Sequence, residues 1–284
     1  MPSAIIDGIA TRYEVVGSGP PLLMYAPGGF NAVVETWSTL GIYGKIKLLD
    51  HLPKTFTCIM FDRRECGQSG GRVERMTWTH YVAQGKALLD HLRISRAHLI
   101  GGCMGCSPVA AFAVAHPEMV ASMILYWPVG GAKYRISSHQ RFAEHLGFVR
   151  SDGLHGVVAL VGKDGKPFGA DPRGGPWASV IKRDAAFAAA YAEQDREEYV
   201  RICQAMRDAL FDRDTAPGAA PEDLMRVDLP ALVVPGHDAS HATSAARYLE
   251  ECLPRAEYWD VSVEQQTEDA ATARVIGFSH RVGA

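Results

Sequence analysis

The sequence predicts an α/β protein with a mostly parallel central sheet, helices on both faces and an inserted, mainly helical segment. Short apolar runs alternate with stretches of helical spacing in residues 1–129, and again from Leu229 onward. Between these parts lies a stretch in which the alternation stops. Strands that alternate with helices form βαβ units, whose strands pair in parallel and whose helices cover the sheet.

Seven segments have the composition of strands. Each is a short, mostly apolar run bounded by glycine, proline or polar turn residues, as is typical of strands in a buried sheet. They are Ile9–Val16, Leu22–Ala26, Phe56–Phe61, Ala97–Gly101, Val120–Tyr126, Ala231–Val234 and Ala256–Val261.

Four segments between or after these strands have apolar residues at helical spacing. The segment Ser107–Ala115 is apolar nearly all round, which predicts a buried helix. They are Met76–Leu92, Ser107–Ala115, the segment that places Ala245, Leu249 and Cys252 on one face, and Ala270–Arg281.

The middle of the chain predicts a separate unit. Residues 130–222 contain a stretch rich in glycine and proline (Gly165–Pro176) and helical patterns around Ala185–Tyr191 and Tyr199–Leu210. We expect a helical cap at 130–222, inserted into a core domain made of residues 1–129 and 223–284.

Composition excludes several classes of protein. The 284 residues are 47% hydrophobic and 21% charged, with a net charge of −3, so a disordered chain and a nucleic-acid or anionic-membrane surface are not indicated. The first residues have no basic segment followed by an apolar run, and no apolar stretch is long enough to cross a bilayer. Six cysteines in a chain of this length do not form a disulfide framework. We expect a cytoplasmic protein with reduced thiols.

The segment His98–Cys106 carries the clearest chemical signal. It reads as a strand, then Gly-x-Cys-x-Gly, then a helix, with Cys103 at the centre. A nucleophile on such a strand-to-helix turn needs a strained backbone, and Gly101 and Gly105 leave room for it. The N-terminus of the following helix favours a thiolate at Cys103.

Four stretches resemble the α/β-hydrolase fold superfamily over nearly the full length of the chain. Two of them depart from its usual pattern: Pro27 stands where the oxyanion loop commonly has histidine, and Glu65 replaces a glycine of the Asp-x-Arg-Gly turn. The stretches are Tyr25–Phe30, Phe61–Ser69, Gly101–Gly105 and Leu229–Asp238.

The resemblance implies roles for particular residues. Cys103 would be the nucleophile and Asp238 the acid of a catalytic triad. The oxyanion hole would consist of the backbone N–H of Met104 and that of Gly29 or Phe30.

The resemblance fails at the histidine of the triad. That residue normally follows the last strand, but residues 261–267 here contain no histidine. His280 follows that strand, yet the helical spacing turns it toward water. His241 lies three residues after Asp238, at the edge of the sheet where ligands bind, and we expect it to be the functional residue. The alternative is a polar residue at a helix N-terminus.

Three other residues near the expected site have alternative readings. Phe30 and the residue after a strand, Trp127, are expected to line the substrate pocket, or else to pack in the core. Cys103 and Cys106 form Cys-x-x-Cys, but no second ligand pair completes a zinc site. We expect Cys106 to be a packing residue, with redox pairing as the alternative, and we expect no metal and no cofactor.

The leading functional hypothesis is a hydrolase of small esters, thioesters, lactones or C–C bonds beside a carbonyl, acting through an acyl intermediate on Cys103. Without a base, a thiol of pKa near 8.5 is mostly protonated at pH 7. A non-catalytic ligand-binding protein and a cofactor-free lyase or isomerase are therefore the alternatives. We expect a small-molecule partner, no nucleic acid and no membrane, with a homodimer left open.

Overall fold

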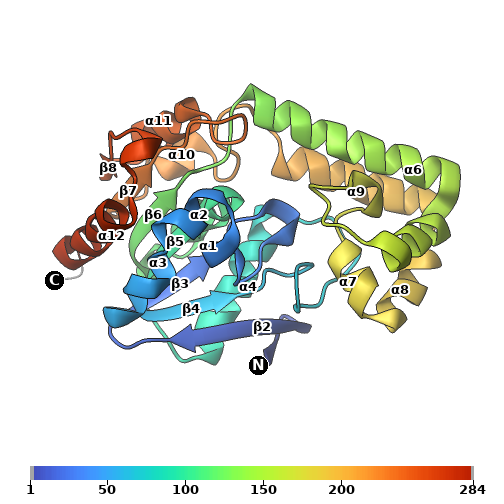
Figure 1. Cartoon of the computed structure of the whole chain (residues 1–284), viewed down its shortest axis with the longest axis horizontal. Coiled ribbons are helices and arrows are strands. Elements are labelled where there is room, and N and C mark those ends of the chain that lie inside the picture. Colours follow the sequence, from blue (N-terminus) through green and yellow to red (C-terminus); the bar gives the residue numbers. More distant parts are fainter. Residues whose placement is uncertain (1–2, 283–284) are drawn as a thin grey trace.

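The computed structural model describes residues 3–282, and its centre is one eight-stranded sheet in the order β1-β2-β4-β3-β5-β6-β7-β8 (Figure 1). β1 pairs with β2, and β2 with β4, in antiparallel fashion, whereas the remaining pairs are parallel. The strands are β1 Ser3–Ile6, β2 Ile9–Val16, β3 Pro21–Tyr25, β4 Thr57–Phe61, β5 Ala97–Gly102, β6 Val120–Tyr126, β7 Ala231–Val234 and β8 Ala256–Tyr258.

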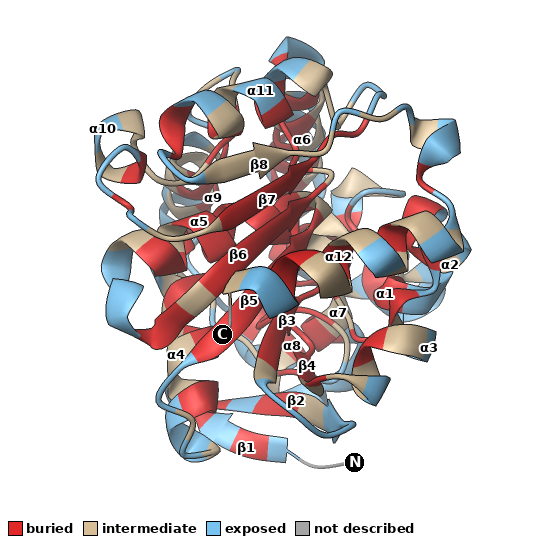
Figure 2. Ribbon diagram, turned by 90° about the vertical axis from the view of Figure 1, so that its left-hand side faces the viewer, coloured by how far each residue is buried: buried red, intermediate tan, exposed pale blue. Residues whose placement is uncertain are grey.

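Helices cover both faces of this sheet. Figure 2 shows the buried central strands between one layer that contains α4, α5, α10 and α11 and another that contains α1, α2, α3 and α12. The helices of these layers are α1 Thr36–Thr39, α2 Gly41–Ile46, α3 Leu48–His51, α4 Trp78–His91, α5 Cys106–Ala115, α10 Pro221–Leu224, α11 Thr243–Cys252 and α12 Glu268–Val282. The predicted α/β class, with a mostly parallel sheet, is confirmed.

The register of the parallel strands fixes the place of the site. Tyr25 pairs with Gly101, Gly101 with Leu125, and Leu125 with Val233. The carboxyl ends of β3, β5, β6 and β7 therefore lie side by side. Ligands of open α/β sheets bind at this edge, where the loops that follow the strands meet.

Residues between β6 and β7 form a group of helices beside this edge (Figure 1). Their buried side chains make a hydrophobic cluster that also includes Met76, Trp78, Tyr81 and Met104 from the sheet-bearing part. Gly153, with a φ of 71°, interrupts the longest of these helices. The helices are α6 Ala132–Asp164, α7 Ala178–Arg183, α8 Ala185–Ala192 and α9 Arg196–Leu210.

Three groups of elements differ from the sequence-based expectation. The predicted strand Ala256–Val261 ends at Tyr258, because Val261 N–H turns back to the carbonyl of Trp259. The short β1 and the helices α1–α3, of four to six residues, are too brief for a periodic signal. The 33-residue α6 contains four glycines, which weaken its helical pattern.

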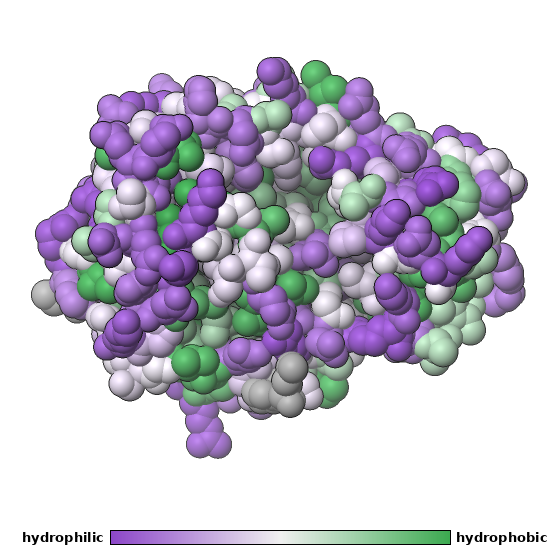
Figure 3. All heavy atoms as spheres, in the orientation of Figure 1, coloured by the Kyte–Doolittle hydropathy of each residue, from purple (hydrophilic) through white to green (hydrophobic). Residues whose placement is uncertain are grey.

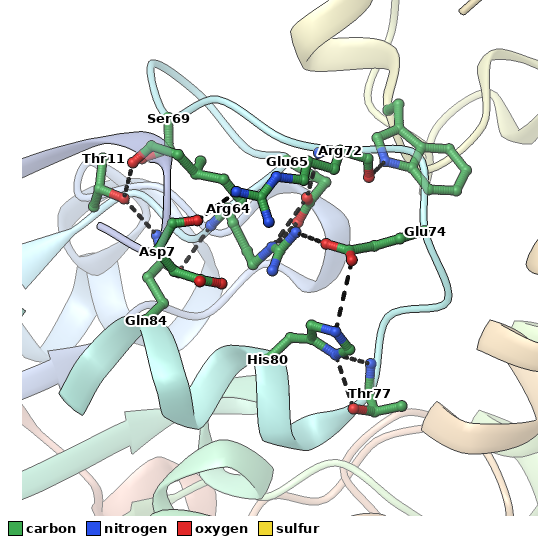
Figure 4. Close-up of polar contacts among 12 residues, drawn as sticks. Asp7, Thr11, Arg64, Glu65, Ser69, Arg72, Glu74, Thr77, His80 and Gln84 are labelled. Atoms are coloured by element: carbon green, nitrogen blue, oxygen red, sulfur yellow. Dashed lines mark hydrogen bonds and ion pairs between the residues drawn. The ribbon is translucent and has the colours of Figure 1, made fainter. Parts of the chain in front are cut away.

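The loop between β4 and α4 contains a buried network of charged groups (Figure 4). Arg64, 2% exposed, bonds to Glu65 at 3.1 Å and to Glu74. Its backbone N–H donates to Gln84 at 2.9 Å. His80 lies beside Glu74 (Figure 4), with 3.8 Å between His80 Nε2 and Glu74 Oε2. The network fixes the shape of a loop that has little regular structure.

The same loop is hydrogen-bonded to the helices between β6 and β7. The indole N–H of Trp177 donates to the carbonyl of Arg72 at 2.7 Å, and Arg183 donates to the carbonyl of Ser69 at 2.8 Å. Trp177 itself is fully buried. A polar loop of the core therefore positions α7 of the inserted helices.

The face of the molecule in Figure 3 is mostly hydrophilic, with hydrophobic residues in small separate patches. Among residues 3–282, no helix is both long and apolar enough to cross a membrane.

Replacing Ile100, fully buried on β5, by alanine should lower the free energy of unfolding by about 2–5 kcal/mol, because it removes packed methylene groups from the core. The matched control is Ile5→Ala on β1, where the side chain is 73% exposed and the loss should stay within about 0.5 kcal/mol. Urea unfolding measures both. Equal losses would contradict this burial pattern.

Glu65 should make stability depend on pH. Burial raises the pKa of Glu65 to about 7, and Arg64 offsets this only in part. The unfolded chain ionises this group more easily, so its contribution to stability should fall as the pH rises from about 4.5 to about 7, by on the order of 1–3 kcal/mol. The difference in unfolding free energy between wild type and Glu65→Gln should therefore decrease across this window. A difference that is constant with pH would refute the assignment.

Candidate active site

Cys103 stands on a sharp turn between β5 and α5. Its φ is 55°, in the left-handed region, as a strained strand-to-helix turn requires. A Cβ on Gly101 would lie 2.3 Å from the carbonyl oxygen of Gly105, and one on Gly105 would lie 2.3 Å from that of Tyr25. Only glycine at both positions allows the turn to pack this closely against β3.

His241 and Asp238 lie together in the loop after β7. His241 Nδ1 is 2.9 Å from both carboxylate oxygens of Asp238. The backbone N–H groups of Ser240 and His241 also donate to Asp238 Oδ1, at 2.7 and 2.9 Å. A bridge between Gly130 and His241 ties this loop to the segment after β6. The histidine and its carboxylate partner thus come from a single turn.

The imidazole of His241 faces Cys103. Its Nε2 is buried and has no partner of standard hydrogen-bond geometry within residues 3–282. Burial alone would raise the pKa of the Cys103 thiol, but interaction with His241 outweighs burial and lowers that pKa. Burial would likewise lower the pKa of His241, yet its contacts with Cys103 and Asp238 raise it to about 9. These opposite shifts both favour the charged thiolate–imidazolium pair over the neutral thiol and imidazole.

The loop after β8, where the family usually has its histidine, is occupied differently. Gln266, 3% exposed, donates to the carbonyl of Pro235 at 2.8 Å and accepts the indole N–H of Trp127 at 2.7 Å. His280 is exposed, as expected, and its ring lies near Phe56 rather than near the site. His237, also exposed, contacts Thr243.

Trp127 does not line the cavity that contains Cys103, which differs from our expectation. Its φ is 56°, in the left-handed region, and its side chain is not among those that line that cavity. The ring packs 5.3 Å from that of His241 and lines a separate cavity of about 590 Å³. Its position supports the histidine instead of the substrate pocket.

Backbone donors surround the sulfur of Cys103. The N–H groups of Gly28 and Met104 both act to lower its pKa. Gly29 and Phe30, expected to supply one of the oxyanion donors, line the cavity beside Cys103. Gly28 was not singled out from the sequence, although it lies in the same Pro-Gly-Gly turn.

Arg63 is a buried cation directly behind this loop. It is 3% exposed, and its Nη2 donates to the carbonyl of Gly29 and contacts Met104 Sδ at 3.9 Å. The carbonyl of Gly29 belongs to the peptide that carries the N–H of Phe30, so the guanidinium polarises that N–H. The guanidinium also stacks 4.4 Å from the centre of the Tyr81 ring. The sequence offered no signal for Arg63 beyond its place in the Asp-x-Arg turn.

The cavity above Cys103 has a volume of about 320 Å³. His241 and Met104 lie at its floor, and α6 forms one wall. The centre of the Phe30 ring lies 5.2 Å from that of Phe168 and 5.9 Å from that of Phe142. Its aromatic lining residues are Phe30, Tyr134, Phe142, Phe168 and Phe211. The size and apolar walls suit a small organic molecule.

The histidines of the inserted segment lie outside this cavity. His145 is buried and bonds to Tyr199 at 2.6 Å, and His139 faces the carbonyl of Phe211. His155 lies near Glu193 at the surface. Cys106 is a free, buried thiol that donates to the carbonyl of Gly101 at 3.1 Å. Within the described part of the chain, no group of three or more His, Cys, Asp or Glu side chains could hold a metal ion.

Comparison with known proteins agrees with this architecture. Residues 21–149 match the family model of the alpha/beta hydrolase fold. A metagenomic alpha/beta hydrolase from the Medee basin superimposes with a TM-score of 0.64 at 18% identity, covering 98% of this chain and 96% of the other. The enol-lactonase of Burkholderia xenovorans superimposes with a TM-score of 0.61 at 21% identity, covering 98% and 99%. The chain therefore has the α/β-hydrolase fold, and residues 21–149 match the model of that family.

Two curated relatives match parts of the chain. A dihydrolipoyllysine-residue acetyltransferase component of the acetoin cleaving system from Cupriavidus necator is 30% identical over 45% of this chain and 32% of its own length. A putative 2-succinyl-6-hydroxy-2,4-cyclohexadiene-1-carboxylate synthase from Bacillus subtilis is 26% identical over 55% of each. The chain thus spans less than two thirds of the length of these relatives.

The pH dependence of Cys103 alkylation tests the pairing with His241. With iodoacetamide, wild-type Cys103 should react with a midpoint below the ordinary thiol value, because the imidazolium stabilises the thiolate. In His241→Ala, burial dominates, so the midpoint should move upward and the rate at pH 7 should fall at least about tenfold. Peptide mapping by mass spectrometry identifies the modified cysteine.

The matched control is His237→Ala, which removes an exposed histidine from the same loop and should leave the profile unchanged. An unaltered pH profile in His241→Ala would show that His241 does not stabilise the thiolate of Cys103.

Proposed function

We propose that the protein is a hydrolase of small esters, thioesters, lactones or C–C bonds beside a carbonyl, acting through a covalent acyl intermediate on Cys103. The observation that carries the proposal is that Cys103 and His241 line the same largely apolar cavity, while Asp238, outside its lining, bonds to His241 Nδ1. A thiol, a histidine that faces it and a carboxylate that orients the histidine make up a nucleophilic triad.

In the first half of the reaction, the thiolate of Cys103 attacks the carbonyl carbon and forms a C–S bond. The negative charge moves to the carbonyl oxygen, which accepts hydrogen bonds from the backbone N–H of Met104 and a donor of the Gly28–Phe30 turn. Collapse of this intermediate breaks the bond to the leaving group. The leaving group takes a proton from the His241 imidazolium, and the acyl group remains on sulfur as a thioester.

In the second half, neutral His241 removes a proton from water through Nε2, and the oxygen attacks the thioester. The C–S bond breaks, which releases the acid and restores the thiolate–imidazolium pair. Asp238 accepts a hydrogen bond from Nδ1–H throughout, so that Nε2 remains the nitrogen available for proton transfer.

We also propose that residues 130–222 act as a cap over a core made of residues 1–129 and 223–284. The location of α6 along one wall of the cavity supports this division. Substrate selection would then reside in the cap, while the reacting groups come from the core.

A cofactor-free lyase or isomerase is the second candidate, because one relative carries the name of a synthase. Such an enzyme could use the same oxyanion donors and His241 without forming a bond to Cys103. A ligand-binding protein without catalysis has less support, since His241 faces the thiol instead of pointing away from it.

Intact-mass spectrometry during reaction with p-nitrophenyl esters and thioesters tests the proposal. Wild type should form an acyl adduct and release product, and Cys103→Ala should do neither while remaining folded. His241→Ala should lose at least about 100-fold in turnover, because general-base catalysis contributes about that much. Turnover without any adduct, retained in Cys103→Ala, would favour the lyase.

A loss below about threefold in His241→Ala would remove this histidine from the mechanism. His237→Ala provides the matched control, with unchanged turnover expected.

A further inference from the structure

One face of α6 carries polar groups toward the cavity. Tyr134, Ser138, Arg141 and Phe142 lie at positions i, i+4, i+7 and i+8, which share one side of a helix, and all four line the cavity. Ser138 is 3% exposed, and its buried hydroxyl oxygen makes no hydrogen bond of standard geometry among the residues that the structure describes, although it lies close enough to Tyr134 to lower the pKa of that phenol. A buried hydroxyl without a partner is costly unless a ligand satisfies it.

Arg141 is the second polar group on this face without a protein partner. Other arginines of the inserted helices are engaged: Arg135 donates to the carbonyl of Phe211, and Arg201 pairs with Glu198 at 2.7 Å. Arg141 makes no ion pair and no hydrogen bond within residues 3–282, although it is half-buried. Side chains on a helix lean toward its N-terminus, so the Arg141 guanidinium extends over the turn that carries Ser138.

The rest of the cavity contains nothing that would neutralise this cation. The lining includes aromatic and small residues, Cys103 and His241, but no carboxylate from the described part of the chain. Because His241 is paired with Asp238 and Cys103, its charge is already balanced. The charge of Arg141 is therefore available to a ligand.

We infer that Ser138 and Arg141 form a subsite for a carboxylate, and that the substrate is an acyl compound with this carboxylate at the far end of its acyl chain. A guanidinium binds a carboxylate through two parallel hydrogen bonds, and the Ser138 hydroxyl supplies a third donor. The inference rests on the proposed function for the position of the scissile carbonyl at Cys103.

The geometry of α6 also sets a length. Arg141 lies seven positions after Tyr134, so their backbones are about 10 Å apart along the helix axis. The Arg141 side chain reaches back over part of this distance. An acyl chain of several carbons spans the remainder, so half-esters of succinic, glutaric and adipic acid bracket the expected substrate.

Matched esters test the subsite. The p-nitrophenyl half-esters of these three diacids are compared with p-nitrophenyl butyrate, which has no carboxylate. Wild type should prefer at least one half-ester by about tenfold or more in kcat/KM, through a lower KM. Arg141→Gln should abolish this preference for half-esters over butyrate, Arg141→Lys should keep part of it, and Ser138→Ala should weaken it.

Arg150→Gln is the matched control. It removes the same charge from the same helix, at an exposed position outside the cavity, so it should leave the preference intact. A wild type that hydrolyses butyrate and all half-esters equally well, or a preference that survives Arg141→Gln, would overturn the inference.

Binding to Cys103→Ala separates the subsite from the chemistry. In calorimetry, this variant should bind monomethyl glutarate at least about tenfold more tightly than methyl butyrate, and Cys103→Ala/Arg141→Gln should lose the difference. Selective binding without turnover in the wild type would refute the proposed hydrolase and retain the subsite. Turnover together with non-selective binding would do the reverse.

Discussion

The candidate site depends on the close approach of three backbone segments at the turn that carries Cys103. Gly101 at the end of β5 packs against Gly105 at the start of α5, and Gly105 packs against the carbonyl of Tyr25 at the end of β3. No side chain fits at either contact. At this close approach the backbone of Cys103 adopts the left-handed conformation, with a φ of 55°. The N–H of Met104 then lies beside the Cys103 sulfur. The positions of Cys103, of the Met104 N–H and of the loop after β3 therefore depend on one packing constraint.

The second half of the site is unusually local. A histidine and its carboxylate partner lie three residues apart, in one turn after β7, instead of in loops that follow two different strands. This turn is held by hydrogen bonds from its own backbone to Asp238 and by the bridge to Gly130. The loop after β8 supplies Gln266, which fixes the indole of Trp127 behind His241. The position of the imidazole thus depends on packing from a loop that contributes no reacting group.

A loop with buried charges contacts both the sheet-bearing part of the chain and the helices between β6 and β7. The loop after β4 carries Arg63 beneath the oxyanion turn and Arg64 within an ion network, and it also accepts hydrogen bonds from Trp177 and Arg183 near α7. Burying such groups is expensive unless each is bonded. Their presence in a loop with little regular structure is consistent with a need for a fixed geometry here, since the loop contacts both the donors of the site and the helices that enclose it.

The sequence by itself predicted seven of the eight strands and the turn that carries Cys103, because apolar runs and a Gly-x-Cys-x-Gly turn are local patterns. It also singled out Asp238 and His241, since both lie in the turn at the carboxyl end of a predicted strand. Only the tertiary structure decided that the His241 ring faces the thiol, that Trp127 supports this ring outside the cavity, and that Arg63, Ser138 and Arg141 border the site. These relations join residues distant in the chain, and their effects on charge depend on burial, which no local pattern encodes.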